Sequence, residues 1–258
     1  MILELSPYAF TIGPIKVYWY GIFMAVSFLV GAYYLYFEGK KRGINEDFLL
    51  NLVVVVIIGG VVGARLMFVL TNFPYWFVTD PIRIIKLYEG GLSWHGGLLG
   101  GLLTGVFYAR IHRVKIEELL DLSVLGLTVG YSLVRIGNIF NQEVLGRMTM
   151  LGFGRWPAQI IGSLIGVILL IRFLRLQQKS LPAGYQFWSF VFYHQLLRGV
   201  FEESVRDNPL FLLGYVNNYW GLGFFTLTQI ATPFILLLAY WFMNRSKTYG
   251  HYVRLPNP

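Results

Sequence analysis

The chain has 258 residues, of which 56% are hydrophobic and 13% are charged, and its mean hydropathy is +0.58. Globular proteins are about half apolar and about a quarter charged, so this composition excludes an ordinary soluble protein and predicts an integral membrane protein. The sequence has no cysteine, which excludes disulfides and a cysteine nucleophile, and its net charge of +8 indicates basic loops at a membrane rather than nucleic-acid binding.

Seven apolar segments have roughly the length that crosses about 30 Å of hydrocarbon. In chain order they lie near residues 17–37, 48–70, 92–109, 119–141, 157–176, 186–203 and 219–243. The sixth segment is aromatic and contains His194, Gln195 and Arg198, so it is the least typical of a membrane span. We therefore expect an all-α, polytopic membrane protein of seven transmembrane helices, folded as a single domain over residues 1–258.

The basic residues outside these segments are distributed unevenly between the two sides of the membrane. Twelve fall in alternate connections and the C-terminal tail, and six fall on the opposite side. The twelve are Lys40, Lys41, Arg42, Arg110, Arg113, Lys115, Arg172, Arg175, Lys179, Arg245, Lys247 and Arg254. Because cytoplasmic loops carry the excess of lysine and arginine, we expect the N-terminus outside and the C-terminus in the cytoplasm.

Three further arginines, Arg65, Arg135 and Arg198, lie in spans or at their ends, where ionisable side chains are costly and usually mark a pathway or a site. In the expected topology each lies toward the outer end of an even-numbered span. Tyr20 opens the first span and His95 opens the third at the same depth. The pattern therefore predicts one polar site in the outer leaflet.

The most polar stretch near a span follows an uncharged run over residues 122–134 and reads Arg135-Ile-Gly-Asn-Ile-Phe-Asn-Gln-Glu-Val-Leu-Gly-Arg147. If the helix continues through it, Arg135, Asn138 and Gln142 fall on one face. A guanidinium holds two phosphate oxygens at once, and carboxamides add neutral donors. The stretch predicts one wall of a phospholipid headgroup site; the alternative is an arginine that reaches from the span end to water.

Two other patterns each allow a functional and a structural interpretation. A histidine changes charge near neutral pH, so His95 suits a proton acceptor, although a solvated interfacial histidine is the alternative. Gly97, Gly101 and Gly105 recur at a spacing of four, which permits close helix packing, and packing is the favoured interpretation of these glycines.

The segment from Arg198 to Arg206 holds a charge pattern at helical spacing. Arg198 to Glu202 and Glu202 to Arg206 are both separated by four residues. Such spacing predicts a salt-bridged helix end that contributes about 0.3 to 0.5 kcal/mol per pair. The alternative is that Arg198 belongs to the polar site, because it follows an apolar, aromatic stretch.

Together these residues resemble the prolipoprotein diacylglyceryl transferase family. The resemblance is carried by Tyr18-Trp19-Tyr20-Gly21, Gly63-Ala64-Arg65-Leu66, Gly90-Gly91-Leu92-Ser93-Trp94-His95-Gly96-Gly97 and the stretch 135–147. The family signature corresponds to Arg135, Gly137, Asn138, Asn141, Glu143 and Gly146. The chain departs from the family pattern at His194, where a tyrosine is usual, and in a short connection that ends in Arg155-Trp-Pro-Ala-Gln159.

The resemblance implies transfer of the diacylglyceryl group from phosphatidylglycerol to the lipobox cysteine of a prolipoprotein signal peptide, the first step of lipoprotein maturation. It places the protein in the bacterial inner membrane with the active site toward the outer leaflet. It requires no metal, no cofactor and no nucleic acid.

The resemblance also implies roles for the site residues. Arg135 and Arg198 would hold the phosphate, Asn138 and Asn141 would orient the headgroup, and His95 or Tyr20 would assist deprotonation of the thiol. Glu143 and Glu202 would position the arginines, and Gly146 would line the substrate site. Arg65 is expected at the same site, with a structural role as its alternative.

Two other classes of function compete with this one. In a transporter, intramembrane arginines line a pathway, but here the polar residues gather at one depth and the halves show no convincing inverted repeat. A non-catalytic phospholipid-binding relative is the second alternative, because the Pro157-Gln159 region and the outer connection are altered.

Overall fold

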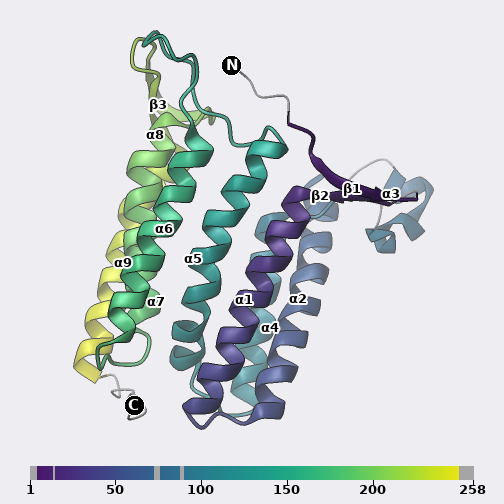
Figure 1. Ribbon diagram of the computed structural model, residues 1–258, viewed down its shortest axis with the longest axis vertical. Coiled ribbons are helices and arrows are strands. Elements are labelled where there is room, and N and C mark those ends of the chain that lie inside the picture. The colour runs from purple at the N-terminus through teal and green to yellow at the C-terminus, as the bar shows by residue number, and fades with distance from the viewer. Residues whose placement is uncertain (1–4, 14, 73–75, 88–89, 250–258) are drawn as a thin grey trace. The chain divides into compact units, whose positions relative to one another are not determined.

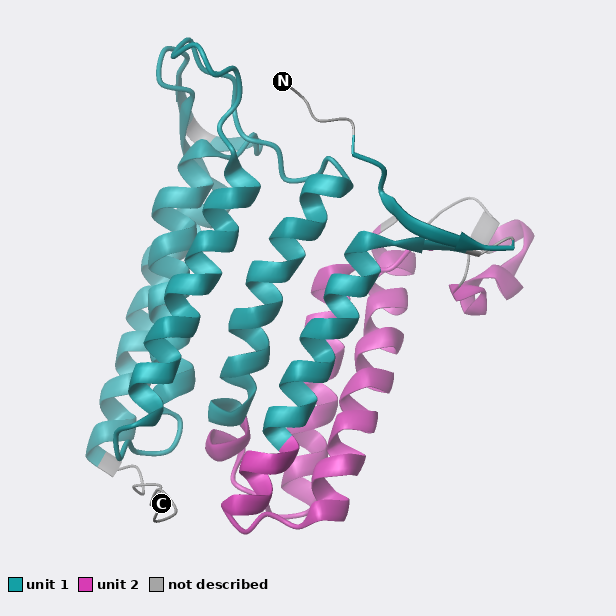
Figure 2. Cartoon of the chain, viewed as in Figure 1, with its two compact units in different colours: residues 1–35, 120–258 teal, residues 36–119 magenta. Residues whose placement is uncertain are grey.

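The computed structural model describes residues 5–13, 15–72, 76–87 and 90–249. Arg254, which entered the expected orientation, lies outside them. The chain forms two compact units, residues 1–35 with 120–258 (unit 1) and residues 36–119 (unit 2), shown in Figure 2. The expectation of a single domain stays a prediction.

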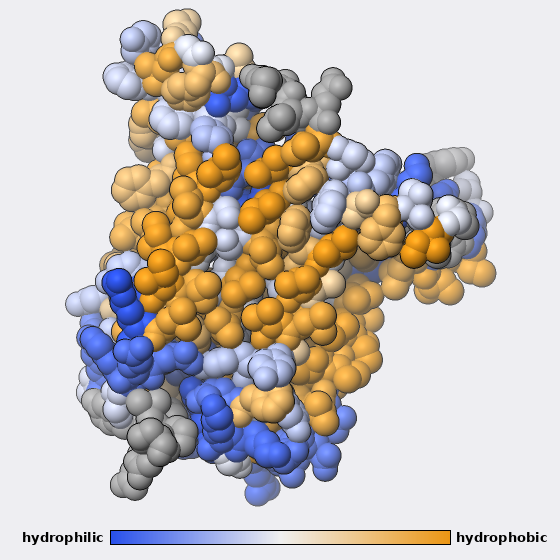
Figure 3. Space-filling model, viewed as in Figure 1, coloured by the Kyte–Doolittle hydropathy of each residue, from blue (hydrophilic) through white to orange (hydrophobic). Residues whose placement is uncertain are grey.

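Unit 1 contains most of the long helices. Its elements are β1 (Tyr8–Ile12), β2 (Ile15–Tyr18), most of α1 (Trp19–Lys41), most of α5 (Ile116–Phe140), α6 (Ala158–Gln177), α7 (Tyr185–Leu196), the π-helix η3 (Leu197–Glu202), α8 (Glu203–Val205), β3 (Leu210–Asn217), β4 (Leu222–Thr226) and α9 (Leu227–Tyr249). Figure 1 shows α5, α6, α7 and α9 following one another in alternating directions. In Figure 3 hydrophobic side chains cover the visible face of these helices along most of their length.

Unit 2 is built mainly on two helices, α2 (Glu46–Asn72) and α4 (Trp94–Ile111). The short α3 (Trp76–Thr79) and the 3-10 helix η1 (Pro81–Ile85) lie between them in sequence. Ser93 caps α4: its hydroxyl accepts a hydrogen bond from the Gly96 amide at 3.4 Å, and its own amide donates to the Ala64 carbonyl at 2.9 Å. The start of α4 is therefore tied to the C-terminal third of α2.

Five helices among the described residues are long and apolar enough to cross a membrane, namely α1, α2, α5, α6 and α9. They confirm an α-helical membrane protein with several spans. The third expected span coincides with α4, and the sixth coincides with the continuous run of α7, η3 and α8. That all seven segments cross the membrane, and in the expected direction, stays a prediction.

The structure is mainly α-helical, as expected, but it differs from the prediction in one span boundary and in two short β-hairpins. The seventh span does not begin near residue 219, because β3 and β4 form an antiparallel hairpin and α9 begins only at Leu227. A second antiparallel hairpin, β1 with β2, precedes α1. Both hairpins lie next to the ends of long helices. Their strands are short and rich in aromatic and β-branched residues, which favour strands.

Close glycine packing joins α2 to α4 in unit 2. A Cβ on Gly63 would lie 2.8 Å from the Gly100 Cα, and a Cβ on Gly105 would lie 3.1 Å from a Val56 methyl group. Backbones can approach this closely only when small residues face each other. The packing interpretation of the glycines is therefore confirmed.

A matched pair of alanine substitutions tests this packing. At Gly63 the added Cβ meets backbone atoms of α4, whereas at Gly60 its nearest atom is the Gly97 carbonyl oxygen at 3.4 Å. We expect Gly63→Ala to lower the free energy of unfolding by about 1 to 3 kcal/mol, the usual cost of overpacking. Gly60→Ala should stay near the wild type. Thermal unfolding in detergent measures both, and equal midpoints for the two variants would contradict the packing shown for α2 and α4.

Candidate functional site

The polar stretch that follows α5 begins with a sharp helix end. The Glu143 amide donates to the Asn138 carbonyl at 3.0 Å and the Gln142 amide donates to the Ile139 carbonyl at 3.3 Å. Gln142 has φ +54°, so these bonds form a Schellman C-cap with glutamine at the left-handed position that glycine usually takes. The helix therefore does not continue, and the expected face of Arg135, Asn138 and Gln142 is wrong: Asn138 is buried in the last turn, and Gln142 is exposed.

Arg135 of α5 forms a buried ion pair with Glu202 of η3, which is distant in sequence. Its Nη2 is 2.8 Å from Glu202 Oε1, and Nη2 also donates to the Tyr131 hydroxyl at 3.2 Å. The Tyr131 hydroxyl donates in turn to the second Glu202 oxygen. Glu202 is fully buried, with 0% of its surface exposed, and Arg135 is 8% exposed. Buried charges persist only when they are paired and hydrogen-bonded, and this pair meets both conditions.

Arg198 pairs with Glu203 rather than with Glu202. In η3 the Glu203 amide donates to the Arg198 carbonyl, five residues back, so each turn holds one more residue than in an α-helix. Arg198 Nη2 accordingly lies 3.8 Å from Glu203 Oε2. The expected pairs at a spacing of four, Arg198 with Glu202 and Glu202 with Arg206, are therefore wrong, because the wider turn rotates Glu202 toward Arg135.

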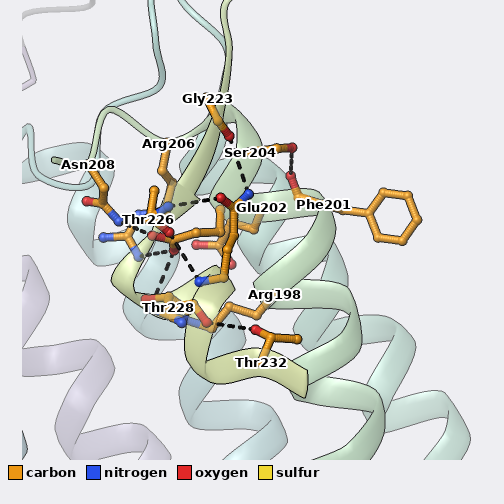
Figure 4. A network of polar contacts seen from close by, with 12 residues as sticks. Arg198, Phe201, Glu202, Ser204, Arg206, Asn208, Gly223, Thr226, Thr228 and Thr232 are labelled. Carbon is orange, nitrogen blue, oxygen red and sulfur yellow. Dashed lines mark hydrogen bonds and ion pairs between the residues drawn. The ribbon is translucent and has the colours of Figure 1, made fainter. Parts of the chain in front are cut away.

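Glu203 is the second buried carboxylate of this network, 1% exposed. Arg206 Nη1 lies 3.6 Å from Glu203 Oε2, and Asn208 Nδ2 donates to Glu203 Oε1 at 2.6 Å. Figure 4 shows Arg206 and Asn208 beside Glu202. Through these ion contacts, which join described residues, three guanidiniums meet two carboxylates. The network therefore carries one positive charge in excess, which suits an anionic ligand.

A loop over the network is fastened by further arginines. The Arg147 amide donates to the Val205 carbonyl at 2.8 Å, and Arg147 Nη2 donates to the Asn208 carbonyl at 2.5 Å. Asp207 contacts Arg155 Nη1 at 3.0 Å and Arg147 Nη1 at 3.7 Å. Arg147 thus joins the loop that follows α5 to the segment that follows α8. The ion pair between Arg155 and Asp207 anchors the region that departs from the family pattern to the same segment.

Gly146 lies at the closest approach within this loop. It forms an antiparallel bridge with Arg206, and its carbonyl accepts a hydrogen bond from Arg155 Nη1 at 2.9 Å. A Cβ on Gly146 would lie 2.7 Å from the Trp156 carbonyl carbon, so no side chain fits. Gln159 Nε2 donates to the Glu143 carbonyl at 2.8 Å, while the Glu143 side chain is exposed.

Tyr20 belongs to unit 1 and lies against the end of α5. A Cβ on Gly137 would lie 3.2 Å from Tyr20 Cδ2, so this glycine makes room for the ring. Asn138 is 3% exposed, and Asn141 Oδ1 is buried with no hydrogen-bond partner among the described residues. Unit 1 therefore brings together the signature residues of α5, Tyr20, Arg198 and the two carboxylates.

Arg65 and His95 belong to unit 2 and are described within it. Arg65 is 6% exposed and donates to four backbone carbonyls, those of Arg83 and Gly90 at 2.5 Å, Ile84 at 2.7 Å and Gly91 at 2.9 Å. His95 lies in the first turn of α4, is exposed, and meets the edge of Trp94 with ring centroids 5.5 Å apart. The Arg65 contacts support the structural alternative for this residue.

Sequence reasoning missed three members of the network: Tyr131, Glu203 and Arg206 as a ligand of Glu203. Tyr131 precedes Arg135 by four residues, so the two share a helix face, and this spacing could have identified it. Glu203 lies at the end of an apolar segment directly after Glu202, and an ionisable residue in such a segment could likewise have indicated a site. At the departure from the family pattern, the His194 ring meets the edge of Tyr131, with centroids 4.5 Å apart.

Comparisons with known proteins give a consistent result. The family model described as prolipoprotein diacylglyceryl transferase matches residues 7–245. A phosphatidylglycerol–prolipoprotein diacylglyceryl transferase of Thermoanaerobacter sp. (strain X514) is 63% identical over 241 residues, which cover 93% of this chain and 94% of the relative. Proteins of the same name from Caldanaerobacter subterraneus subsp. tengcongensis and Thermus thermophilus are 62% and 32% identical, over 94% and 91% of this chain and 94% and 96% of the relatives.

Removal of the Glu202 charge tests the buried pair. Glu202→Gln leaves the Arg135 guanidinium buried without its carboxylate, so we expect a loss of about 3 to 5 kcal/mol in the free energy of unfolding. The matched control is Glu143→Gln, the same change at an exposed side chain, which should cost less than about 0.5 kcal/mol. Chemical unfolding in detergent measures both. A Glu202→Gln protein as stable as the control would contradict the pair.

Proposed function

Because the chain belongs to the prolipoprotein diacylglyceryl transferase family, we propose that its buried arginine–carboxylate network serves the transfer of a diacylglyceryl group from phosphatidylglycerol to the cysteine thiol of a lipoprotein precursor. The protein is accordingly a transferase of lipoprotein biosynthesis in a membrane. The observation that carries the site assignment is the excess positive charge of the network beside the signature residues of α5.

The reaction sets clear demands on the site. The thiol loses its proton to a base, the thiolate sulfur bonds to the glycerol carbon, and the carbon–oxygen bond to the phosphate breaks. The electron pair of that bond goes to the phosphate oxygen, so glycerol phosphate leaves with one more negative charge than the phosphodiester carried. The site must therefore align sulfur with carbon and stabilise charge on the phosphate.

Arg198 and Arg135 are the proposed phosphate ligands. Arg135 is held by a 2.8 Å contact with Glu202, whereas Arg198 reaches Glu203 only at 3.8 Å, beyond hydrogen-bond length. The Arg198 fork is therefore the better placed of the two to take two phosphate oxygens. Arg135 adds positive charge and, through Glu202 and Tyr131, rigidity.

Asn138 and Asn141 are the proposed ligands of the glycerol headgroup. The buried Asn141 Oδ1 accepts no hydrogen bond from the described residues, and a headgroup hydroxyl is a donor of the right kind. Glu143 is proposed to act through its carbonyl, which holds Gln159. Gly146 is proposed to keep the loop close to α6, because Trp156 leaves no room for a side chain there.

The base that takes the thiol proton is proposed to be His95 or Tyr20. Arg65 is proposed to help position His95. It donates hydrogen bonds to the carbonyls of Gly90 and Gly91, which lie just before Ser93, the N-cap of α4, whose first turn contains His95. Retention of the wild-type rate by His95→Gln would leave the base role to Tyr20. A Tyr20→Phe protein would then be expected to lose transfer at neutral pH and regain it at higher pH, where a thiol of pKa about 8.5 ionises unaided.

The proposed setting is the bacterial inner membrane, crossed seven times, with the N-terminus outside and the site toward the outer leaflet. The five long apolar helices and the excess of lysine and arginine in alternate connections support it. Neither a metal nor a cofactor enters the proposed reaction.

Direct transfer tests the proposal. Protein purified in detergent receives phosphatidylglycerol and a synthetic lipobox peptide with a free cysteine, and mass spectrometry detects the diacylglyceryl addition. We expect addition to the cysteine peptide and none to a Cys→Ala peptide. The absence of addition from folded protein that still binds the lipid would instead favour a non-catalytic phospholipid-binding relative.

The same assay distinguishes the arginines from other basic residues. Arg135→Ala should abolish detectable addition, and Arg198→Lys should lower the rate at least about tenfold, because a point charge lacks the planar two-donor fork. Arg175→Lys, at an exposed position in the last turn of α6, is the matched control. A rate in Arg198→Lys equal to that of the control would remove Arg198 from the phosphate site.

A further inference from the structure

Two adjacent glutamates in unit 1 serve different arginines. Glu202 contacts Arg135 Nη2 at 2.8 Å and accepts a hydrogen bond from Tyr131. Glu203 contacts Arg198 Nη2 at 3.8 Å and Arg206 Nη1 at 3.6 Å, and it accepts a hydrogen bond from Asn208. Both carboxylates are buried, at 0% and 1% exposure. Two neighbouring buried charges repel each other, so each needs its own cations.

The π-helical turn makes this division possible. In an α-helix the neighbours of Arg198 on its own face would be the residues three and four positions further on, Phe201 and Glu202. The extra residue in η3 brings the position five further on, Glu203, beneath Arg198. Glu202 is thereby released toward Arg135 on α5. Single π turns inside helices are frequent at functional sites.

We propose that Glu203 is a positioning residue that holds Arg198 for the phosphate, separately from Glu202, which holds Arg135. The inference rests on the proposed function and deepens it. Asn208 Nδ2 fixes one Glu203 oxygen at 2.6 Å, and the other oxygen faces Arg198 and Arg206. Glu203 thus offsets the free-energy cost of partly burying the Arg198 charge, and it leaves the N–H donors of the Arg198 guanidinium available.

The length of the contact matters for the reaction. A guanidinium in ion contact with its carboxylate at 2.8 Å, as Arg135 is, must give up that close contact to turn toward a ligand. Arg198 at 3.8 Å gives up little, because a contact of that length is not a hydrogen bond. As negative charge develops on the leaving phosphate, Arg198 can turn toward it while Asn208 and Arg206 hold Glu203 in place.

The test is a double-mutant cycle on transfer. Glu203→Gln keeps the shape and removes the charge, and we expect it to lower kcat/KM for phosphatidylglycerol about tenfold. In an Arg198→Lys background the same change should have almost no further effect, whereas in an Arg135→Lys background it should keep its full effect. Ser204→Ala, a neighbour whose hydroxyl donates to the Phe201 carbonyl, is the control and should match the wild type.

A second variant guards against misfolding of Glu203→Gln. Asn208→Ala removes the donor that fixes Glu203 but leaves the carboxylate charge, so it should cause a smaller loss of kcat/KM that also vanishes in the Arg198→Lys background. Wild-type kinetics in both variants would overturn the proposal. So would losses that are equal in the wild-type and Arg198→Lys backgrounds, because a general structural effect does not depend on Arg198.

Lipid-dependent stabilisation separates this inference from the proposed function. If the wild type binds phosphatidylglycerol but transfers nothing, the proposed function fails, and the cycle is then measured as the rise in unfolding temperature at saturating phosphatidylglycerol. Loss of that rise in Glu203→Gln, relative to Ser204→Ala, still supports the positioning role. An unchanged rise overturns it.

Discussion

Two neighbouring carboxylates lie buried in unit 1, and the arrangement around them follows from the need to neutralise both. Removing an ion from water costs several kcal/mol even after relaxation, so Glu202 and Glu203 could not share one cation. The π turn of η3 directs them apart, Glu202 to Arg135 and Glu203 to Arg198 and Arg206. Three guanidiniums and two carboxylates leave one excess positive charge, which a bound phosphate can neutralise.

The end of α5 complements this charge arrangement. Because the helix stops in a Schellman cap, Asn138 stays in the buried last turn and the chain turns away at Gln142 toward Gly146. The loop then pairs with the segment after α8 through Arg147 and Asp207. The residues that carry charge and the residues that can contact a headgroup are therefore fixed relative to each other within unit 1.

Much of this could be predicted from the sequence, and the reasons are physical. Long apolar runs place helices because hydrocarbon demands a minimum length, and buried arginines mark a site because they are costly there. Arg65, Arg135 and Arg198 were expected at one site on these grounds. Arg135 and Arg198 belong to the network of unit 1, whereas Arg65 binds backbone carbonyls within unit 2. The role of Glu202 was expected only from the resemblance to the family. Gly97, Gly101 and Gly105 of α4 were expected to pack against a neighbouring helix, and they lie against α2.

The remainder depended on backbone geometry that residue spacing does not reveal. The charge pairs at Arg198 were predicted for an α-helix, and one extra residue per turn in η3 changed both partners. Gln142 adopts a left-handed conformation that glycine usually takes, so the sequence carries no glycine that would indicate the helix end there. The carbonyls that bind Arg65 come from a segment without regular periodicity, and both hairpins are short.

The central claim is that the loosely held Arg198 binds a phospholipid phosphate, and equilibrium binding of phosphatidylglycerol tests it most directly. Native mass spectrometry of the detergent-purified protein would compare the wild type with Arg198→Gln and with Arg175→Gln, an exposed arginine of α6. The account predicts that Arg198→Gln weakens binding at least about tenfold, the scale of a charged bidentate contact, while Arg175→Gln binds as the wild type does. Equal affinity in all three proteins would contradict it.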